Sequence, residues 1–383
     1  MIELIPYRKK WSLLMSKNTT KLATLKLAAM GCHIQITLNI TKIGTQHSQE
    51  IIDHQISLLK SETQQRLARW EHIFSRFDET SELMRLNNHT DQWREVSAEL
   101  FEVLGRAIYF VVETQGLITP TLLKPLWAAG YRQSFETLPK MSTPSIPVIT
   151  SNSGSNAATY LQAQPNANNP NQQIDSIQCR RLVDGQHQIY LPAGIALDLN
   201  GYVKGWCAMQ LAEQISRSHD WQLPCLVDMG GDIAIGVPRS QALDNAIDSP
   251  IVWGVAIAKP YCANGEHMQN DQDVAILTLR SGAVATSGQD YRRWWHKGRP
   301  QHHLIHPHYS RPAISDVLTA TVMAADTVTA EVYAKYCVLL GVTEAITWLN
   351  QHHIAALLID TNNNVISSIA IEPNLSEPNL VAV

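Results

Sequence analysis

The sequence predicts an α+β protein whose strands pair largely as hairpins, with long helices between them. Strand-like segments are separated by short turns, as in CLVDMGGDIAIGV at 225–237, where two strands flank a Gly-Gly turn. A long helical periodicity covers 49–77, and helices and strands do not alternate as regular βαβ units. The chain has 383 residues, of which 45% are apolar, so it can bury a large core.

The first third of the chain predicts one strand region and two helices. The segment 26–38 ends in alternating apolar and polar residues, which is typical of a half-buried strand. From Gln49 to Phe77, apolar residues recur at helical spacing, which predicts a long amphipathic helix. A second helix is expected to begin after the N-cap Ser97 and to stop at Gly116.

A polar segment at 141–174 contains no charged residue and is dominated by Asn, Ser, Gln, Thr and Pro. It cannot bury enough apolar surface to offset the entropy of ordering it, so we expect a disordered surface insertion there. The predicted organisation is an N-terminal extension, 1–21, followed by a single domain over 22–383 that contains this insertion.

The second half of the chain predicts further strands and three helices. The segment 194–215 indicates a strand, a tight Asn-Gly turn and a helix. Further strands are expected at 251–258 and 274–280, and a hairpin around 361–364. The remaining helices are expected at Thr327–Leu340, ended by Gly341, and at Glu344–Leu349, capped by Thr343.

Charge and composition exclude several classes of protein. The 30 Lys and Arg residues nearly balance 34 Asp and Glu residues, so nothing favours a nucleic-acid or anionic-membrane partner. No stretch approaches the ~18 uninterrupted apolar residues of a membrane span. No secretory signal is recognisable, so a cytoplasmic location is expected. The six cysteines form no CxxC pair, which favours buried reduced thiols.

The segment DLNGYVKG, from Asp198 to Gly205, is a candidate anion site at the start of a predicted helix. Backbone N–H groups at a helix start favour anions, and Lys204 supplies a point charge for a phosphate. An ordinary turn with a solvated lysine explains the same residues, so both interpretations stay open. The same holds for the 230–232 turn GGD, whose paired glycines permit close approach of a ligand or merely form the turn.

Two other segments concentrate reactive side chains. The run 286–312 contains, among tryptophans and arginines, His296, His302, His303, His306 and His308. A zinc site, a general base and a polar loop with solvated histidines are the alternatives for this run. Glu331 and Lys335 have the i,i+4 spacing of an ion pair, on a predicted helix whose apolar neighbours indicate partial burial.

In order and spacing, these segments resemble the FAD:protein FMN transferase (ApbE) family over roughly 30–349. The motifs that carry the resemblance are MGC at 30–32, FSRFDETSELMRLN at 74–87, GLITPTLLKPLWAAGY at 116–131, ALDLNGYVKGW at 196–206, VDMGGDIAIG at 227–236, GAVATSGQDYRR at 282–293, HHLIHP at 302–307 and AEVYAKYCVLLG at 330–341. The last three motifs and DLNGYVKG are specific only jointly. The resemblance implies an ApbE-like, T-fold-like α+β fold with antiparallel sheets flanked by helices.

The resemblance also implies an activity: with Mg2+, FMN moves from FAD onto a Thr or Ser hydroxyl of an acceptor flavoprotein, and AMP is released. His303 matches the base that takes the proton of the acceptor hydroxyl. Gly201, through its carbonyl, and Glu331 would face the metal. The residues that would line the flavin nucleotide are Met30, Phe77, Leu117, Ile118, Thr119, Asp198, Lys204 and Leu304. Most family members act outside the cytoplasmic membrane, which makes a periplasmic, membrane-associated location the alternative.

The chain departs from the family pattern at several positions. The family's flavin-facing Tyr is Phe77 here, its FDPT Asp is Thr119, and its HxxD Asp is His306. The metal helix usually offers Asp and Thr four residues apart, whereas this chain has Glu331 and Lys335, and an ammonium cannot ligate Mg2+.

We therefore expect altered metal dependence, with Lys335 as a second catalytic candidate beside the pyrophosphate. At ~4 Å and an effective dielectric constant of ~20, its ammonium would contribute about 4 kcal/mol of attraction per unit charge. The alternative hypotheses are a non-catalytic FAD-binding protein and an FAD pyrophosphatase in which water replaces the acceptor hydroxyl.

Overall fold

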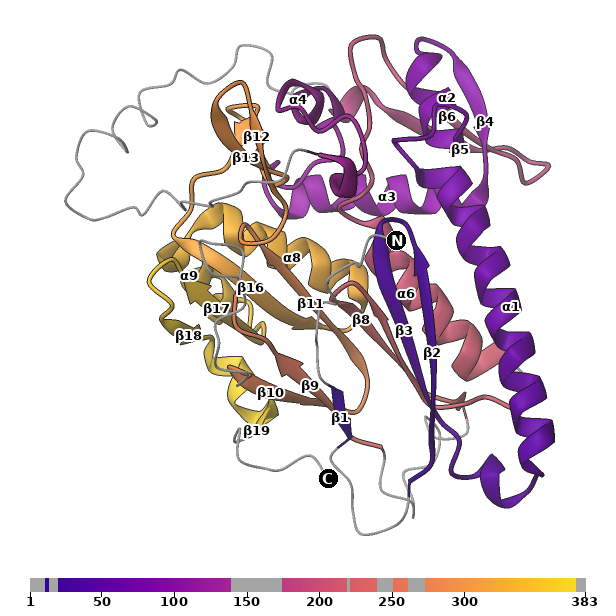
Figure 1. Cartoon of the computed structure of the whole chain (residues 1–383). Coiled ribbons are helices and arrows are strands. Elements are labelled where there is room, and N and C mark those ends of the chain that lie inside the picture. Colours follow the sequence, from indigo (N-terminus) through magenta and orange to yellow (C-terminus); the bar gives the residue numbers. More distant parts are fainter. Residues whose placement is uncertain are drawn as a thin grey trace.

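Three layers make up the body of the protein: helices, a large antiparallel sheet and a smaller sheet (Figure 1). The computed structural model describes residues 11–13, 20–138, 174–218, 221–239, 251–260 and 273–376. The expected insertion at 141–174 lies, apart from its last residue, outside the described residues. None of the helices in the described ranges is long and apolar enough to cross a membrane.

The central layer is an eight-stranded sheet in which all neighbouring strands are antiparallel. Its strands, in spatial order, are β18 (Val365–Ser367), β17 (Ala356–Asp360), β16 (Val317–Ala324), β11 (Gly282–Gly288), β8 (Asp232–Gly236), β7 (Cys225–Met229), β3 (Cys32–Asn39) and β2 (Leu22–Ala29). The pattern confirms the expected antiparallel α+β architecture. Three of the seven strand pairs, β2–β3, β7–β8 and β17–β18, are hairpins, and longer segments join the other four.

A four-stranded sheet packs on one face of the large sheet. Its strands, in spatial order, are β1 (Trp11–Leu13), β9 (Trp253–Ile257), β10 (Ala275–Leu279) and β19 (Leu375–Ser376). The two sheets share an apolar core, in which Ile233 and Val284 of the large sheet belong to the same cluster as Val255 and Leu277 of the small one. Strand β1 comes from the segment expected to be an N-terminal extension, so part of 1–21 adds an edge strand to this sheet.

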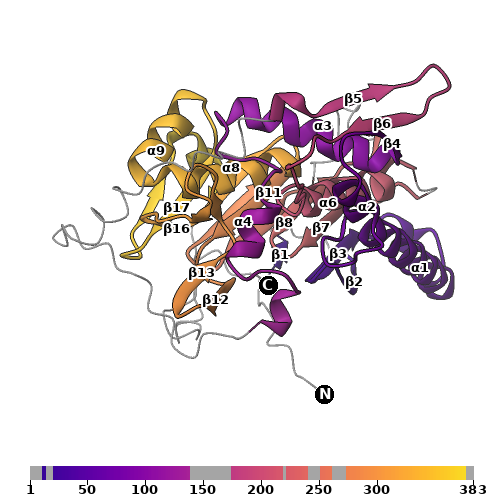
Figure 2. The ribbon, with the colours of Figure 1, turned by 90° about the horizontal axis from the view of Figure 1, so that it is seen from above.

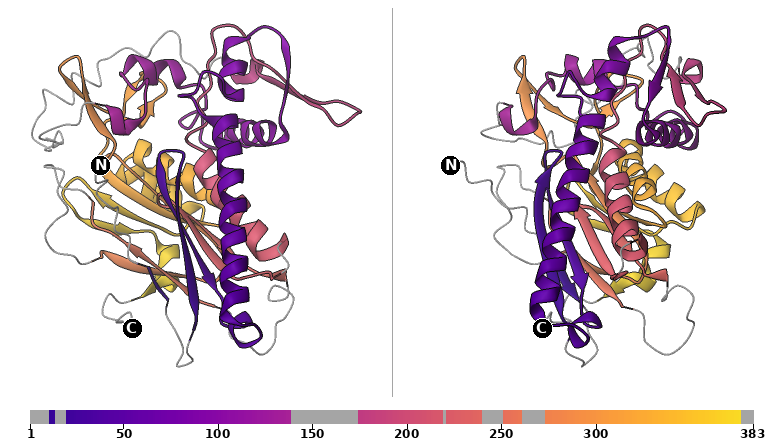
Figure 3. Two further views of the ribbon diagram at one scale, coloured as in Figure 1. Left: turned by 45° about the vertical axis from the view of Figure 1, so that its right-hand side comes forward. Right: turned by 90° about the vertical axis from the view of Figure 1, so that its right-hand side faces the viewer.

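Helices cover the opposite face of the large sheet. Helix α6 (Val203–Glu213) packs on β7 and β8, and α8 (Thr327–Leu340) packs on β11 and β16. In the view from above, α1 (Gln49–Phe74) lies beside β2 and β3, and α9 (Val342–Gln351) lies toward the opposite end, near β17 (Figure 2). Figure 3 shows α1 running along the edge of the molecule with α6 behind it.

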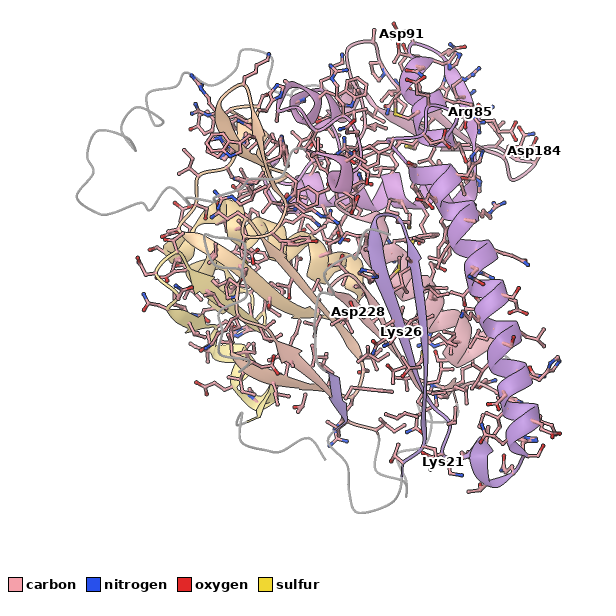
Figure 4. The ribbon with its side chains drawn as sticks, in the orientation of Figure 1. Lys21, Lys26, Arg85, Asp91, Asp184 and Asp228 are labelled. Atoms are coloured by element: carbon pink, nitrogen blue, oxygen red, sulfur yellow. The ribbon has the colours of Figure 1, made fainter. Side chains whose placement is uncertain are left out.

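The remaining elements lie around the ends of these layers. They are the helices α2 (Glu82–Asn88), α3 (Ala98–Glu113) and α4 (Leu123–Ala128), the three-stranded sheet β4 (Trp93–Val96), β6 (His187–Tyr190) and β5 (Gln178–Arg181), and the hairpins β12 (Arg293–His296) with β13 (Arg299–His302) and β14 (Ile305–His306) with β15 (Arg311–Pro312). Short 3-10 turns occur at Ile43–Thr45, Phe135–Thr137 and Ile369–Asn374, and a π turn at Gln214–Ser218 follows α6. Arg85, Asp91 and Asp184 lie near the three-stranded sheet, far from Asp228 on the large sheet (Figure 4).

Several elements have the limits that the sequence predicts. The side chain of Ser97 accepts a hydrogen bond from the backbone N–H of Leu100 and caps α3. Gly341 ends α8 with a φ of 84°, a conformation that favours glycine. The hairpins β7–β8 and β17–β18 and the strands β9 and β10 are also confirmed.

Other predictions about element limits are wrong. Helix α1 ends at Phe74, so Phe77 lies beyond it. By contrast, the alternating second half of 26–38 forms strand β3 as predicted, and it pairs with β2 because Met30 and Gly31 between the two strands adopt positive φ angles of 54° and 65° and reverse the chain. Helix α9 begins at Val342 instead of Glu344, because the carboxylate of Asp316 accepts the Val342 N–H.

The strand predicted before α6 does not form. Residues 194–199 carry no strand pairing, although their apolar pattern predicts one. The Leu197 N–H donates to the side chain of Asn87, and the Asp198 N–H donates to the Pro120 carbonyl. These backbone donors therefore have partners in loops and side chains, which makes sheet pairing unnecessary.

The described cysteines form no disulfide. Cys207, Cys225 and Cys337 are buried, in agreement with the predicted buried thiols, whereas Cys179 is exposed and Cys32 is half-buried. Burial raises the pKa of the Cys225 and Cys337 thiols to about 12, so both stay protonated at neutral pH.

Candidate active site

Helices α6 and α8 approach each other closely at Gly205, in the first turn of α6. A Cβ atom at Gly205 would lie 2.8 Å from the Thr327 carbonyl oxygen and 2.9 Å from Glu331 Oε2. The Gly205 N–H donates to the same Oε2 at 3.0 Å. Glycine at this position therefore allows the helix start to meet a carboxylate of the neighbouring helix directly.

Two lysines and two carboxylates form a buried cluster between α6, α8 and β8. Lys204 of α6 donates to Asp232 of β8, and its Nζ lies 3.5 Å from Glu331 Oε1. Lys335 Nζ lies 2.8 Å from the same Glu331 oxygen. The side chains of Glu331 and Asp232 are 0% and 1% exposed, so their charges depend on these partners rather than on water.

The electrostatics of the cluster keep Glu331 ionised. Burial disfavours its charge, but Lys335 and Lys204 outweigh burial and hold the pKa of Glu331 below its usual value. Burial likewise disfavours the charge of Lys204, yet Asp232 and Glu331 raise the pKa of Lys204 above its usual value. Burial, followed by the neighbouring Glu331, raises the pKa of Asp232. Lys204 therefore remains a cation at neutral pH.

Lys335 also reaches the turn that precedes α6. Its Nζ donates to the Gly201 carbonyl at 2.9 Å and to Glu331 Oε1 at 2.8 Å. The two groups that were expected to face a metal ion thus both accept a hydrogen bond from one ammonium. Within the described ranges, no three His, Cys, Asp or Glu side chains form a group that could hold a metal ion. These residues do not fit a divalent cation between Gly201 and Glu331.

Asp198 is held by the turn and by a buried arginine. One carboxylate oxygen accepts the Asn200 N–H at 2.9 Å, and the other lies 3.6 Å from Arg76 Nε. The Arg76 guanidinium carbon lies 4.3 Å from the Phe77 ring centroid and 4.1 Å from that of Tyr131. Arg76 Nε and Nη2 are buried and have no hydrogen-bond partner among the described residues. The arginine therefore retains donor capacity next to two aromatic rings.

Among the predicted nucleotide-binding residues, Phe77 is much more exposed than Thr119, Ile118 and Leu304. Its side chain is 40% exposed, whereas those three are 5–6% exposed. Thr119 Oγ1 pairs with Thr121 Oγ1 at 2.9 Å, and Leu304 packs in the core between β16 and α8. These three residues are buried, whereas Phe77 presents a ring at the surface.

The remaining predicted nucleotide residues reach the α6 region from other loops. Met30, at the tip of the β2–β3 hairpin, lies against α6, with its Sδ 3.8 Å from Cys207 Sγ. Leu117 lies between α3 and α4, in the segment whose Pro120 carbonyl accepts the Asp198 N–H at 2.7 Å. The structure therefore connects the segments of Met30, Leu117 and Asp198 around the start of α6.

His303 is the histidine of the 286–312 run that lies beside the charged cluster. Burial, followed by Arg292, His302, Lys335 and Lys204, holds the pKa of His303 well below its usual value. Its Nδ1 is buried and has no hydrogen-bond partner among the described residues. A neutral imidazole with a free nitrogen can accept a proton, which favours the general-base alternative for this run.

The other histidines with shifted pKa values, His302 and His306, also have a buried Nδ1 without a hydrogen-bond partner among the described residues, but the two lysines of the cluster do not contribute to their pKa shifts. His302 Nε2 lies 2.8 Å from the Ala313 carbonyl, and burial lowers the pKa of His302 to about 4. Burial and His308 lower the pKa of His306 to about 4. His302 therefore fixes the loop that carries His303, because its ring is engaged by the backbone of the segment after β15.

Sequence reasoning missed three residues of this site. Asp232 was singled out only as part of a turn, yet it is the buried partner of Lys204. Arg76 lies in the FSRFDET motif, and Arg292 lies in GAVATSGQDYRR, but nothing in either motif distinguishes these arginines from their neighbours. Arg292 is close enough to Lys204 to oppose its charge and close enough to His303 to lower its pKa.

Together these features define an α+β protein with a buried cluster of charged side chains between α6, α8 and β8. The sequence model of the ApbE family matches residues 30–358. The chain belongs to the ApbE family. The solved structures agree on the fold: an ApbE protein from Thermotoga maritima aligns with a TM-score of 0.68 and 21% identity, covering 93% of this chain and 100% of that one.

Curated relatives share the same description. A FAD:protein FMN transferase from Treponema pallidum is 29% identical over 192 residues, which are 49% of this chain and 51% of the relative. One from Haemophilus influenzae is 26% identical over 302 residues, 76% of this chain and 75% of the relative. The match thus spans about half the length of the first relative and three quarters of the second. The flavin transferase ApbE from Vibrio cholerae aligns with a TM-score of 0.63 and 19% identity.

Proposed function

We propose that this protein is a FAD:protein FMN transferase, which moves FMN from FAD to a Thr or Ser hydroxyl of an acceptor flavoprotein. The acceptor oxygen forms a bond to the FMN phosphorus, the pyrophosphate P–O bond breaks, and AMP leaves. The observation that carries the proposal is the fixed pair of lysines, Lys204 and Lys335, beside the neutral imidazole of His303. Phosphoryl transfer depends mainly on such positioning and on stabilisation of phosphate charge.

The start of α6 supplies the proposed binding site for the pyrophosphate. Helix N-termini favour anions, and Lys204 lies in the first turn of this helix. Arg292 adds a further cation near Lys204. At ~4 Å and an effective dielectric constant of ~20, each unit charge contributes about 4 kcal/mol of attraction to a phosphate charge.

His303 is the proposed base for the acceptor hydroxyl. In the free protein, burial and then the neighbouring Arg292, His302, Lys335 and Lys204 lower the pKa of His303, so the ring is neutral and able to take a proton. The negative charge of a bound pyrophosphate would offset these cations and raise the pKa of His303 toward the working pH. The proton that leaves the acceptor oxygen then moves to the imidazole.

The aromatic group around Arg76 is the proposed platform for the flavin. Phe77 offers an accessible ring, and its stacking does not need the hydroxyl that the family's tyrosine has at this position. Arg76 Nε faces the Asp198 carboxylate, and Arg76 Nη2 is buried without a hydrogen-bond partner among the described residues. Met30 and Leu117 would complete the wall of the nucleotide site, whereas Ile118, Thr119 and Leu304 position it from the core.

The experiment combines the protein, FAD and a purified acceptor domain that carries a threonine flavinylation site. Mass spectrometry of the acceptor measures covalent FMN, and chromatography measures AMP; an acceptor whose threonine is replaced by valine is the control. One AMP for each FMN attached supports the proposal. No attached FMN under any divalent cation or in EDTA contradicts it.

Two other outcomes would assign a different function. FAD that binds without release of AMP would indicate a non-catalytic flavin-binding protein. FMN and AMP formed from FAD without an acceptor would indicate a pyrophosphatase that uses water.

A further inference from the structure

We propose that the Lys335 ammonium is the built-in cation of this site and that it replaces a divalent metal ion between Gly201 and Glu331. The inference rests on the proposed function for its catalytic consequence, which is FMN transfer that needs no divalent cation. Its structural content is the placement of Lys335 Nζ, 2.9 Å from the Gly201 carbonyl oxygen and 2.8 Å from Glu331 Oε1.

The position of the ammonium excludes a metal ion bound to the same two oxygens. Mg2+ holds its oxygen ligands at about 2.0–2.1 Å. An ion at that distance from both the Gly201 carbonyl and Glu331 Oε1 would occupy the space of Lys335 Nζ and would be repelled by its charge. Metal binding there requires Lys335 to leave both of its acceptors.

Glu331 has no free oxygen to offer instead. Oε1 faces Lys335 at 2.8 Å and Lys204 at 3.5 Å, and Oε2 accepts the Gly205 N–H at 3.0 Å. The carboxylate is 0% exposed, so water does not solvate it. To ligate a metal ion, Glu331 would have to give up hydrogen bonds and ion pairs that compensate its fully buried charge.

The ammonium is fixed where a positive charge is useful to the reaction. Lysine side chains are usually mobile, but Lys335 is only 13% exposed and is bound at its tip by two acceptors from α8 and the turn before α6. It is also close enough to His303 to lower the pKa of that imidazole. A cation held in place before the substrate arrives stabilises phosphate charge without reorganisation. Burial lowers the pKa of Lys335 from its usual value, and Glu331 opposes this effect. In the proposed reaction Lys335 acts as a fixed charge and gives up no proton.

The first test measures metal binding without any reaction. Mn2+ is titrated into the full chain without FAD and followed by electron paramagnetic resonance, for the wild type and for Lys335→Ser, which removes the ammonium and offers a hydroxyl oxygen. We expect no bound Mn2+ in the wild type and one bound ion in Lys335→Ser, lost again in the double variant Lys335→Ser/Glu331→Gln. Circular dichroism confirms that each variant folds. Bound Mn2+ in the wild type that is lost in Glu331→Gln would overturn the inference, as would a Lys335→Ser variant that binds none.

The second test measures transfer to the threonine acceptor in EDTA and in Mg2+. The wild type should label the acceptor at the same rate in both. Lys335→Met, which keeps the length but not the charge, should be about 10²-fold slower, the usual cost of losing one charge-stabilising group. Lys335→Ser should regain activity when Mg2+ is added. A wild type that stops in EDTA and recovers with Mg2+ contradicts the inference; a wild type inactive in both contradicts the proposed function, and the Mn2+ titration then decides the inference alone.

Discussion

The two faces of the large sheet differ in what they bury, although the same strands form both. Along β8, Ile233 and Ile235 point into the apolar core shared with the four-stranded sheet. Asp232, on the same strand, points instead toward α6 and α8 and binds Lys204. Both faces bury apolar side chains, but on the face covered by helices the apolar core is interrupted by four charges that need each other. Because alternate side chains of a strand point to opposite faces of a sheet, the five residues of β8 contribute both to the apolar core between the sheets and to the charged cluster.

Replacement of His303 should give the largest effect, which is a loss of FMN transfer at the charged site. His303→Gln removes the group that takes the acceptor proton, so single-turnover transfer of FMN should slow by about 10²–10⁴-fold. The affinity for FAD, measured by flavin fluorescence, should change little, because glutamine keeps a polar side chain at the position. His308→Gln, on the same run of histidines, is the control and should keep its rate. Equal rates for His303→Gln and the wild type would exclude the histidine as the base.

Truncation of Leu277 should destabilise the apolar core between the two sheets and leave the charged site unchanged. Leu277 is 0% exposed in the core between the two sheets, so Leu277→Ala should lower the free energy of unfolding by about 2–5 kcal/mol. Urea denaturation measures this change, and FAD affinity should remain that of the wild type. The matched control is Leu375→Ala on the neighbouring strand, whose side chain is 37% exposed and whose loss should cost less. A large loss of FAD affinity in Leu277→Ala would show that the two faces are coupled.

Acid should act on the buried His302 of β13, which lies outside the apolar core between the two sheets. His302 has a pKa of about 4 in the folded protein against 6.5 when exposed, so the unfolded chain binds the proton more tightly. Its contribution is complete above pH 6.5 and is lost as the pH falls toward 4, at a total cost of about 3 kcal/mol. His302→Gln should lose less stability across this window than the wild type in urea melts. Parallel pH profiles for the two proteins would contradict this assignment.

A methyl group at Gly205 should sharpen the comparison, because it strains the contact between α6 and α8 without touching the apolar face. Gly205→Ala places a carbon within 3 Å of the Thr327 carbonyl and Glu331, so we expect a loss of about 1–3 kcal/mol and weaker FAD binding. Gly105→Ala in α3 is the control, because its Cβ would meet nothing within 4 Å. That variant should gain about 0.5–1 kcal/mol from the helix propensity of alanine. Thermal unfolding distinguishes the two glycines.

The fold could be predicted from local patterns wherever one element determines its own structure. Ser97 marks the start of α3 and Gly341 the end of α8, because caps depend on side chains within one turn. The strand expected before α6 failed because its partners, Asn87 and Pro120, are distant in sequence. A loop with satisfied backbone groups and a strand have the same apolar pattern.

The candidate site was predictable in some of its members but not in their connections. Lys204, Glu331 and Lys335 were recognised from their motifs, and the structure brings them together. That Asp232 completes the cluster and that Lys335 bonds to the Gly201 carbonyl depend on the packing of α6 against α8 and β8. No spacing in the sequence reports a contact across 134 residues.

The ammonium that joins Gly201 to Glu331 is attached to the polypeptide by covalent bonds. Each molecule of the protein therefore carries one such charge, which cannot be removed by dialysis or exchanged for a competing ion. Fluctuations in the free magnesium of the surroundings would leave its occupancy unchanged. The protein would then be ready for its nucleotide as soon as α8 has docked on α6, without a loading step.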